Sequence, residues 1–411
     1  MTTNAHRRER DRRTWGGAPI AILCMGVAVV LPGCSDLLTP ENPGEILAED
    51  LQDPNALPIL LNGVAGDFNY LYTRAIIAFG HFSNEIWHTG SASGWRELDR
   101  GLADPQGGLG SVYNNATKAN WVADNAAALI LEAFDDGASR PELAKARIYA
   151  GFSQLLLADN FCEVTVNGSA PMTPSEIYTL AKGHFTEAIN IATGAGSTAF
   201  RLQSLAGRAR ANLMLGQFQA ARDDAKQIPV DWRFEAVYSQ NSSREENTVP
   251  SHTVARFRKE AGVDPRFFND PRYATDPRLN FKNGGPTVVG EDRIRQFVEQ
   301  TKYPERFSNA NISSWQEARL IEAEAELELG NTDRAIELVN EVRAAAPLPP
   351  YSGAATKAAV KDQIMFERSV ELFLEAKHLA DLRRTNSPLL SGRADCGPIS
   401  WEEQESNNNV K

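Results

Sequence analysis

The sequence is poor in the residues that metal and catalytic centres use. Among its 411 residues there are only 6 histidines and 4 cysteines. The chain contains no Gly-x-Ser-x-Gly elbow, no His-Glu-x-x-His motif and no glycine-rich phosphate loop, which are patterns typical of nucleophilic, zinc and nucleotide sites. We therefore expect no catalytic residue, no metal and no cofactor, and predict that the protein is not an enzyme.

Positive charge and long apolar runs are also scarce. The formal net charge is -11, whereas nucleic-acid binders need clustered lysine and arginine to neutralise phosphates. After the N-terminal region, no apolar run is long enough to span a bilayer. These two deficits predict that the protein binds no nucleic acid and that its mature part crosses no membrane.

The N-terminal region has the order of a lipoprotein export signal. Residues 6–13 are rich in arginine, residues 18–31 are apolar but too short for a stable membrane helix, and Cys34 follows shortly after. We predict that residues 1–33 are a signal peptide, that Cys34 carries the lipid and that residues 34–54 form a tether. The protein is then held at a membrane surface by its lipid anchor. The alternative is an ordinary secretory signal that happens to end at a cysteine.

Two further cysteines, Cys162 and Cys396, belong to the mature part of the chain. An even pair outside the cytoplasm favours a disulfide, and two separately buried thiols are the alternative. Neither cysteine has a second cysteine or a histidine at the spacing of metal ligands. We therefore expect a disulfide and not a metal site.

Helical periodicity dominates the mature sequence. Apolar residues recur at helical spacing over residues 64–82, 115–134 and 143–161, with Trp121 as one of the larger anchors of the second segment. The run Thr-Pro-Ser-Glu at 173–176 predicts a helix start with a capping box, in which the threonine and the glutamate satisfy each other's backbone N–H groups.

Two helical pairs repeat one pattern of small residues. The pattern occurs at Ala209, Gly216, Ala221 and Ala225, and again at Ala323, Gly330, Ala335 and Val339. Helices pack this closely only where side chains are small, and the glycine relieves the reversal between them. This spacing is typical of tetratricopeptide hairpins, and unrelated antiparallel hairpins are the alternative.

We therefore predict an all-α fold in which tetratricopeptide-like helical hairpins form a superhelical stack. The hairpins belong to a single domain over residues 55–411. A long irregular, aromatic-rich insertion at about residues 229–311 separates the two repeats, and a stretch of that length without regular elements is typical of a functional insertion.

Several motifs resemble those of the SusD/RagB family of outer-membrane nutrient-binding lipoproteins. The similar stretches are Cys-Ser-Asp-Leu-Leu at 34–38, Trp-Gln-Glu-Ala-Arg-Leu-Ile-Glu-Ala-Glu-Ala at 315–325, Asn-Glu-Val-Arg at 340–343, Glu-Arg-Ser-Val-Glu-Leu at 367–372, Asp-Leu-Arg-Arg at 381–384 and Pro-Ile-Ser at 398–400. The resemblance implies a surface lipoprotein that binds a nutrient, a glycan in the first instance, and delivers it to a SusC-like TonB-dependent transporter. An oligopeptide ligand and a surface scaffold without a small ligand are the alternatives.

The expected ligand site combines two groups of residues, one after the first helix and one in the insertion. Flat aromatic faces suit sugar rings, and neighbouring amide or guanidinium groups bond hydroxyls. The candidate binding residues are Asn84, Trp87, Trp95, Arg96, Trp232, Tyr238 and Tyr273. The alternative is that these aromatics only fill gaps between helices and loops.

Glu367, Glu371 and Glu375 recur at every fourth position, on one predicted helix. Glycoside hydrolysis needs two carboxylates that face each other across the scissile bond, which neighbours on one helical stripe do not. We therefore expect a structural ion-pair network. The expected partners are Arg368, Arg383 and Arg384.

The histidines are not expected to bind metal. His81 and His88 are seven residues apart and could share a helical face, but no cysteine or glutamate pattern completes a zinc site. His184 lies on an apolar helix face, which predicts a core position. His378 is expected to cap a helix or to pair with the acidic residues near it.

Overall fold

The computed structural model describes residues 49–53 and 55–410. The predicted signal peptide and the predicted lipidation site Cys34 lie outside the described residues. The end of the predicted tether, however, belongs to the folded body, because Leu51 is buried and lies in a short 3-10 helix. No helix within the described residues is long and apolar enough to cross a membrane.

The elements follow one another along the chain in an order dominated by helices. The helices are η2 (Glu49–Gln52), α1 (Ala56–Phe82), α2 (Ser93–Asp99), α3 (Gly108–Ala133), η3 (Gly137–Ser139), α4 (Pro141–Asn160), α5 (Pro174–Gly194), α6 (Thr198–Met214), α7 (Phe218–Ala225), α8 (Val249–Thr253), α9 (Pro265–Asn269), α10 (Pro271–Ala274), α11 (Trp315–Glu328), α12 (Thr332–Ala345), α13 (Lys357–Glu371), α14 (His378–Arg384), η4 (Pro388–Leu390) and α15 (Trp401–Ser406). The strands are β1 (Ile86–His88), β2 (Arg233–Ala236), β3 (Ala261–Val263), β4 (Lys282–Asn283), β5 (Val298–Glu299) and β6 (Ala310–Ser314).

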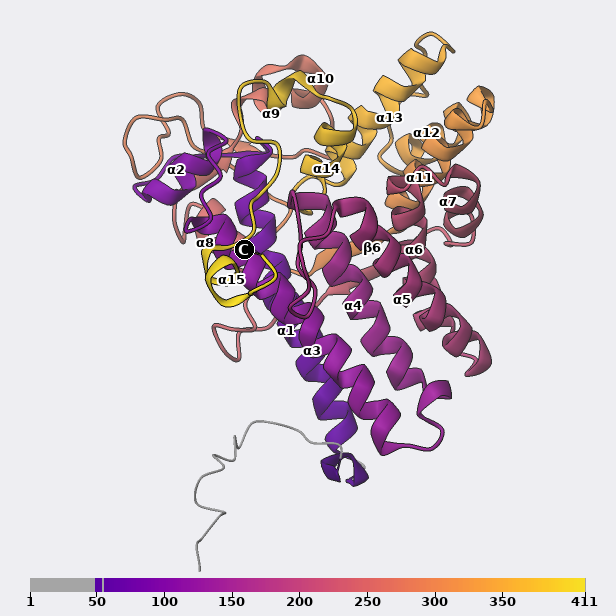
Figure 1. Cartoon of the computed structure of the whole chain (residues 1–411). Helices are drawn as coiled ribbons and strands as arrows, with labels where there is room; N and C mark the ends of the chain where they lie inside the picture. The colour runs from indigo at the N-terminus through magenta and orange to yellow at the C-terminus, as the bar shows by residue number, and fades with distance from the viewer. Residues whose placement is uncertain (1–48, 54, 411) are drawn as a thin grey trace, which may run out of the picture. The chain divides into compact units, whose positions relative to one another are not determined.

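The long helices α1, α3, α4, α5 and α6 lie side by side, each in contact with the next (Figure 1). The three predicted N-terminal helices are confirmed, although each begins before the predicted segment. One detail of the prediction is wrong. Trp121 is no core anchor of α3, because its side chain is 52% exposed, and small residues such as Ala119 and Ala123 form the buried face instead.

The predicted capping box at the start of α5 is present. The hydroxyl of Thr173 accepts the backbone N–H of Glu176, and the carboxylate of Glu176 accepts the backbone N–H of Thr173 at 2.8 Å. Two backbone donors that the helix itself leaves unpaired are thereby satisfied. The pKa of Glu176 is lowered because the hydrogen bonds from Thr173 favour the charged form of its carboxylate.

The two repeated helical pairs are antiparallel hairpins, as the sequence predicts. Helices α6 and α7 form the first and α11 and α12 form the second, and α7 also contacts α11. The glycines Gly216 and Gly330 take positive φ angles of 68° and 92° at the two reversals, which explains why glycine stands there. The small residues of the pattern are buried, and the mostly helical, tetratricopeptide-like fold is confirmed.

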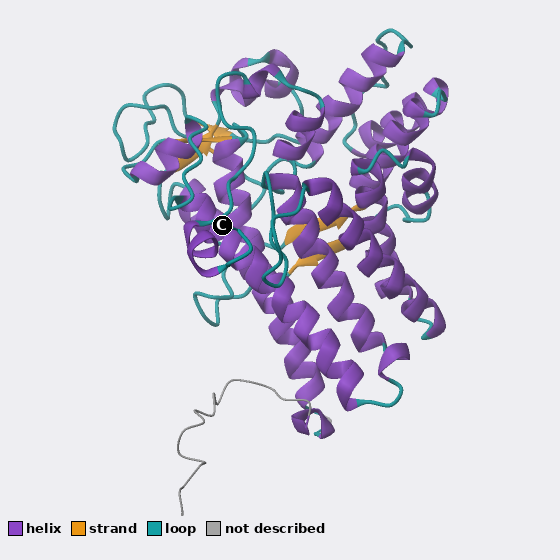
Figure 2. Cartoon of the chain, in the orientation of Figure 1, coloured by secondary structure: helices purple, strands orange, loops and turns teal. Residues whose placement is uncertain are grey.

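The segment between the repeats is built from short elements joined by long loops, as Figure 2 shows in teal and orange. Three two-stranded antiparallel sheets occur in the described residues, β1 with β3, β2 with β6 and β4 with β5. The first of these joins the insertion to the end of α1 through the pairing of Trp87 with Gly262. The insertion therefore pairs with the segment that directly follows α1 and is not a free loop.

The glutamate stripe does form ion pairs, but it does not run along one helix. Helix α13 ends at Glu371, and Glu375 lies in the turn at 372–377, where Leu374 and Ala376 have positive φ angles. The partners also differ from the expected ones. Glu367 bonds Arg278 and Arg343 at 2.6 Å each, Glu371 bonds Arg278 at 3.0 Å, and Glu375 bonds Lys302 at 2.8 Å and Lys377 at 3.1 Å.

The expected arginine partners are used elsewhere. Arg368 and Arg384 both pair with Asp381, at 2.7 Å, and Arg383 donates to backbone carbonyls at the end of α4. The break between α13 and α14 separates Arg383 and Arg384 from the glutamates, whereas Arg368, on α13 itself, pairs with Asp381 of α14. The cations that replace them come from the insertion, from α12 and from the turn, which helical spacing does not reveal.

Candidate ligand-binding site

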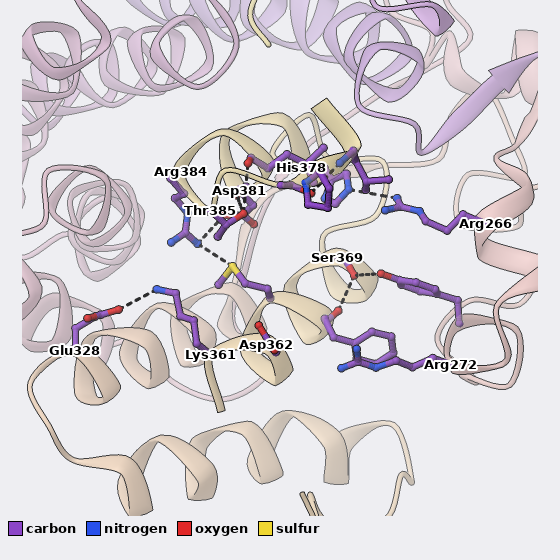
Figure 3. Close-up of a pocket in the computed structure, with 17 residues that line it drawn as sticks. Arg266, Arg272, Glu328, Lys361, Asp362, Ser369, His378, Asp381, Arg384 and Thr385 are labelled. Carbon is purple, nitrogen blue, oxygen red and sulfur yellow. Dashed lines mark hydrogen bonds and ion pairs between the residues drawn. The ribbon is translucent and has the colours of Figure 1, made fainter. Parts of the chain in front are cut away.

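A hollow of about 660 Å³ lies between the short helices α9 and α10 and the C-terminal helices α13 and α14 (Figure 3). It combines aromatic rings with several charged side chains. The residues that line it include Arg266, Arg272, Tyr273, Lys361, Phe366, Ser369, His378, Asp381 and Arg384. Its size lies within the range of ordinary small-ligand sites.

A local sequence motif builds the insertion side of this hollow. The triplet Asp-Pro-Arg occurs at 264–266, 270–272 and 276–278. In each copy the aspartate side chain accepts the backbone N–H of the arginine two residues later, at 2.9, 2.9 and 3.0 Å. In the first two copies the proline occupies the first turn of α9 or α10, where its fixed φ and missing N–H cost nothing. Arg266 and Arg272 are thereby placed on either side of the hollow's aromatic wall.

The guanidinium of Arg266 is held by uncharged partners. Its Nη2 donates to the backbone carbonyl of Asn84 and to Nε2 of His378, both at 3.3 Å, and it lies 5.6 Å from the ring centre of Tyr273. Figure 3 shows Arg266 and His378 pointing toward one another. Burial and the charge of Arg266 lower the pKa of His378 to about 3, so its neutral imidazole acts as the acceptor.

Arg272 and Tyr273 complete the insertion side of the hollow. The Arg272 guanidinium lies 4.0 Å above the Phe366 ring and bonds the Gln363 amide. The hydroxyl of Tyr273 accepts a hydrogen bond from Ser369 at 3.3 Å. Within the described part of the chain, neither Arg266 nor Arg272 has a carboxylate within 4.0 Å. Both guanidiniums therefore keep N–H groups for a ligand.

The opposite side of the hollow is already neutralised. Lys361 bonds Glu324 at 2.5 Å and Glu328 at 3.1 Å, and Arg384 bonds both Glu324 and Asp381. Burial alone would raise the pKa of Asp381, but Arg368 and Arg384 hold it well below its usual range. This side offers a fixed, charge-balanced wall. The free donors are on the insertion side.

The candidate residues after the first helix form a separate cluster. Trp87 lies in β1 with Arg295 5.9 Å from its ring, and Trp95 stacks on His81 with ring centres 5.4 Å apart. Both indoles are half-buried between loops, and Arg96 is exposed on α2. Asn84 joins this cluster to the hollow, because its carbonyl accepts from Arg266.

The histidines of this cluster pair with carboxylates and do not share a helical face. Nδ1 of His81 lies 2.7 Å from Asp99, and Nδ1 of His252 lies 2.7 Å from Glu260. His88 is buried in β1, and no third ligand atom joins it and His81 in the described residues. His184 lies beside Asp124 and Gln154 and is half-buried, not in the core as expected.

The two other insertion aromatics are structural. Tyr238 is buried and its hydroxyl donates to the carbonyl of Asn69 at 3.0 Å, so its assignment to the ligand site is wrong. Trp232 packs between the two largest apolar clusters of the body. Both flank the β2–β6 pair, which lies against α1 and α6. Of the predicted binding residues, only Tyr273 lines the hollow, and Asn84 contacts it through Arg266.

Cys162 and Cys396 are joined by a disulfide with Cα atoms 5.1 Å apart. The bridge ties the loop after α4 to the C-terminal segment, and the backbone N–H of Cys162 donates to the carbonyl of Gly397 at 2.9 Å. The sequence left open whether the two thiols were paired. The structure pairs them because Phe161 and Gly397 run side by side in a short parallel bridge.

The structure is a helical body with a hollow that an inserted loop region lines on one side. The model of the SusD family matches residues 293–408. This C-terminal part of the chain is therefore similar to the SusD family. A search among curated proteins found no match.

Solved structures of the family share the fold over most of the chain. A SusD superfamily protein from Bacteroides vulgatus is 16% identical, with a TM-score of 0.70 over 88% of this chain and 98% of its own. A SusD-like carbohydrate binding protein from the same species is 17% identical, with a TM-score of 0.64 over 80% and 83%. A laminarin binding SusD-like protein is 14% identical, with a TM-score of 0.62 over 86% and 98%.

Proposed function

We propose that the protein binds a glycan in the hollow between α9–α10 and α13–α14. The observation that carries this proposal is the pair of guanidiniums, Arg266 and Arg272, that flank the Tyr273 ring and have no carboxylate partner among the described residues. The apolar face of a sugar ring packs against an aromatic ring, and its hydroxyl or carboxylate oxygens accept from guanidinium N–H groups. The carbohydrate-binding and laminarin-binding relatives support the same class of ligand.

The proposal includes delivery to a transporter. The export signal at 1–33 and the cysteine at Cys34 support a lipid anchor in the outer membrane. The similarity of residues 293–408 to the SusD family supports a SusC-like TonB-dependent transporter as the partner. We expect the protein to co-purify with such a transporter from detergent-solubilised membranes, and recovery of unrelated proteins alone would contradict the partnership.

Binding is tested by isothermal titration against a panel of soluble oligosaccharides, including laminarin oligosaccharides, and against a panel of oligopeptides. Tyr273→Ala and Arg272→Ala should each weaken glycan binding about tenfold, because a well-placed aromatic or arginine contact contributes on the order of 1 to 3 kcal/mol. Arg233→Ala is the matched control, since Arg233 is also exposed but lies in β2, outside the hollow.

The outcomes separate the alternatives. Binding of oligopeptides and of no oligosaccharide would favour a peptide ligand. Binding of neither panel would favour a scaffold without a small ligand. Equal weakening by Arg233→Ala and by Arg272→Ala would show that the effect does not come from the hollow.

A further inference from the structure

A second hollow, of about 360 Å³, surrounds the exposed indole of Trp121 on α3. The side chain of Trp121 is 52% exposed, although an indole is among the most costly side chains to leave in water. Within the described residues Trp121 belongs to none of the apolar clusters, so it has no core role there. A single tryptophan on a flat surface is common and needs no functional explanation. An exposed aromatic ring inside a hollow lined by polar groups is, by contrast, the arrangement expected of a binding site.

Polar side chains from three separate segments surround this ring. Asn114, Thr117 and Lys118 come from the same face of α3, since they precede Trp121 by about one and two helical turns. Thr165, Asn167 and Gly168 come from the loop after α4, and Glu403 comes from α15. Amide, hydroxyl, ammonium and carboxylate groups thus face one aromatic surface.

The charges of this hollow balance, unlike those of the first. Among the described residues that line it, Lys118 and Glu403 are the ionisable ones. Lys118 reaches Asp67 at 3.3 Å but is 55% exposed, so its ammonium remains available. A hollow without net charge, with an apolar platform and mixed donors and acceptors, suits an uncharged polyhydroxyl ligand.

The walls are held in place before any ligand arrives. The Cys162–Cys396 disulfide ties the loop to the C-terminal segment just before both reach the hollow. Asn407 and Asn409 then donate to the carbonyls of Ser169 and Gly168 at 2.9 and 2.8 Å. These bonds join the tail to the loop at Gly168 and Ser169.

Two further features keep this wall rigid. Thr165 donates to the carboxylate of Glu403 at 2.7 Å, across the gap between loop and tail. Asn167 and Gly168 turn the loop with positive φ angles of 52° and 77°, conformations that these two residue types tolerate best. A site that is already ordered loses little conformational entropy on binding.

We propose that Trp121 and its surroundings form a second glycan-binding site, in which a pyranose ring stacks on the indole and its hydroxyls bond Lys118, Asn167 and Glu403. This inference rests on the proposed function for the class of ligand, but it uses none of the same residues. Two sites on one rigid body bind a long polysaccharide with greater avidity than either site alone, provided that one chain reaches both.

The test is affinity electrophoresis of the folded protein in native gels that contain laminarin, starch, xylan, galactomannan or polygalacturonate. We expect at least one polysaccharide to retard the wild type. Trp121→Ala should reduce that retardation at least about threefold, and Lys118→Met should reduce it to a smaller extent. Trp401→Ala is the matched control, because Trp401 is 43% exposed and does not line the hollow.

The Tyr273→Ala variant in the same gels separates this inference from the proposed function. Loss of retardation in Tyr273→Ala, with Trp121→Ala and Lys118→Met like the wild type, would overturn the second site and leave the first. Loss in Trp121→Ala alone would support the second site and remove the first. Failure of every polysaccharide to retard the wild type would overturn both.

The disulfide provides an independent arm of the test. The double variant Cys162→Ser, Cys396→Ser removes the covalent tie of the tail that forms one wall, whereas no described residue of the loop or the tail lines the hollow at Tyr273. We expect the double variant to lose part of the retardation that Trp121→Ala loses, while its titration with short oligosaccharides at the Tyr273 hollow is unchanged. Retardation equal to that of the wild type in the double variant and in Trp121→Ala would contradict the second site.

Discussion

The helical hairpins and the junction that joins them to the C-terminal turn are stabilised by different interactions. In the hairpins, buried alanines such as Ala209 let the helices pack closely, and Gly216 takes the positive φ angle of the reversal. At the junction, buried ions meet. Lys377 of the turn bonds Glu317 of α11 and Glu375 of the turn, and Arg210 of α6 bonds Asp159 of α4.

The comparison shows two ways to join helices that come from distant parts of the chain. Apolar contacts need only small, complementary surfaces and tolerate a local shift. Buried charges lose much of their hydration energy, and each is tolerated only while its partner stays in place. Burial alone would raise the pKa of Glu375, but Lys302 and Lys377 lower it. The junction therefore accepts one arrangement of α11 and the turn, whereas the hairpins tolerate small adjustments.

The largest expected effect comes from Lys377→Met. Lys377 is 1% exposed, and its loss leaves two buried carboxylates short of a cation. Removing one member of a buried ion pair typically costs about 3 to 5 kcal/mol, and we expect that loss in the free energy of unfolding, measured by urea denaturation. Lys226→Met is the control, because the side chain of Lys226 is 53% exposed and pairs with Asp223 at the surface. This substitution should change the free energy of unfolding by less than about 1 kcal/mol. Similar losses in both variants would remove the distinction between buried and exposed pairs.

A second test uses pH. Glu85 is buried, accepts the backbone N–H of Leu374 at 2.8 Å, and burial raises its pKa from 4.5 to about 7. The unfolded chain gives up this proton near pH 4.5 while the folded chain keeps it to about pH 7, so stability falls as pH rises through that window and the loss is complete above it. The difference corresponds to about 3 kcal/mol.

Glu85→Gln removes this ionisation and keeps the carbonyl acceptor. We expect the variant to match the wild type at pH 4.5 and to exceed it by about 3 kcal/mol at pH 8. His378, whose lowered pKa destabilises the folded state in acid, acts equally in both proteins, so comparing them at each pH cancels its effect. An equal difference at both pH values would contradict the raised pKa.

The smallest expected effect belongs to the helical stack. A Cβ at Gly207 of α6 would lie 2.3 Å from the ring of Phe185 in α5. Gly207→Ala should therefore destabilise the protein by about 1 to 3 kcal/mol through overpacking, despite the better helix propensity of alanine. Gly183→Ala on the same α5 meets nothing within 4 Å and should stabilise it by up to about 1 kcal/mol. Thermal unfolding of both variants checks the prediction. A stabilised Gly207→Ala variant would show that the Phe185 ring can move aside without loss of stability.

Local signals in the sequence were sufficient for the helices and their reversals. The capping box at Thr173 and the glycines at Gly216 and Gly330 act on neighbours a few residues away, so their effect is visible in the order of residues. The Asp-Pro-Arg triplets are equally local and predict short capped turns. What they do not indicate is where each arginine points.

That choice belongs to the tertiary structure. Arg266 and Arg272 face a hollow, while Arg278, in the same motif, pairs with Glu367. The reason is that α14 and α13 present the rings of His378 and Phe366 to the first two arginines. To Arg278, α13 presents the buried carboxylate of Glu367. Likewise Trp121 lies open on a regular helix and Tyr238 is buried in an irregular insertion. The exposure of a side chain depends on whether segments distant in the sequence cover it. The ion-pair partner of a charged side chain likewise depends on which opposite charges the fold brings near it. Neither property can be read from helical spacing.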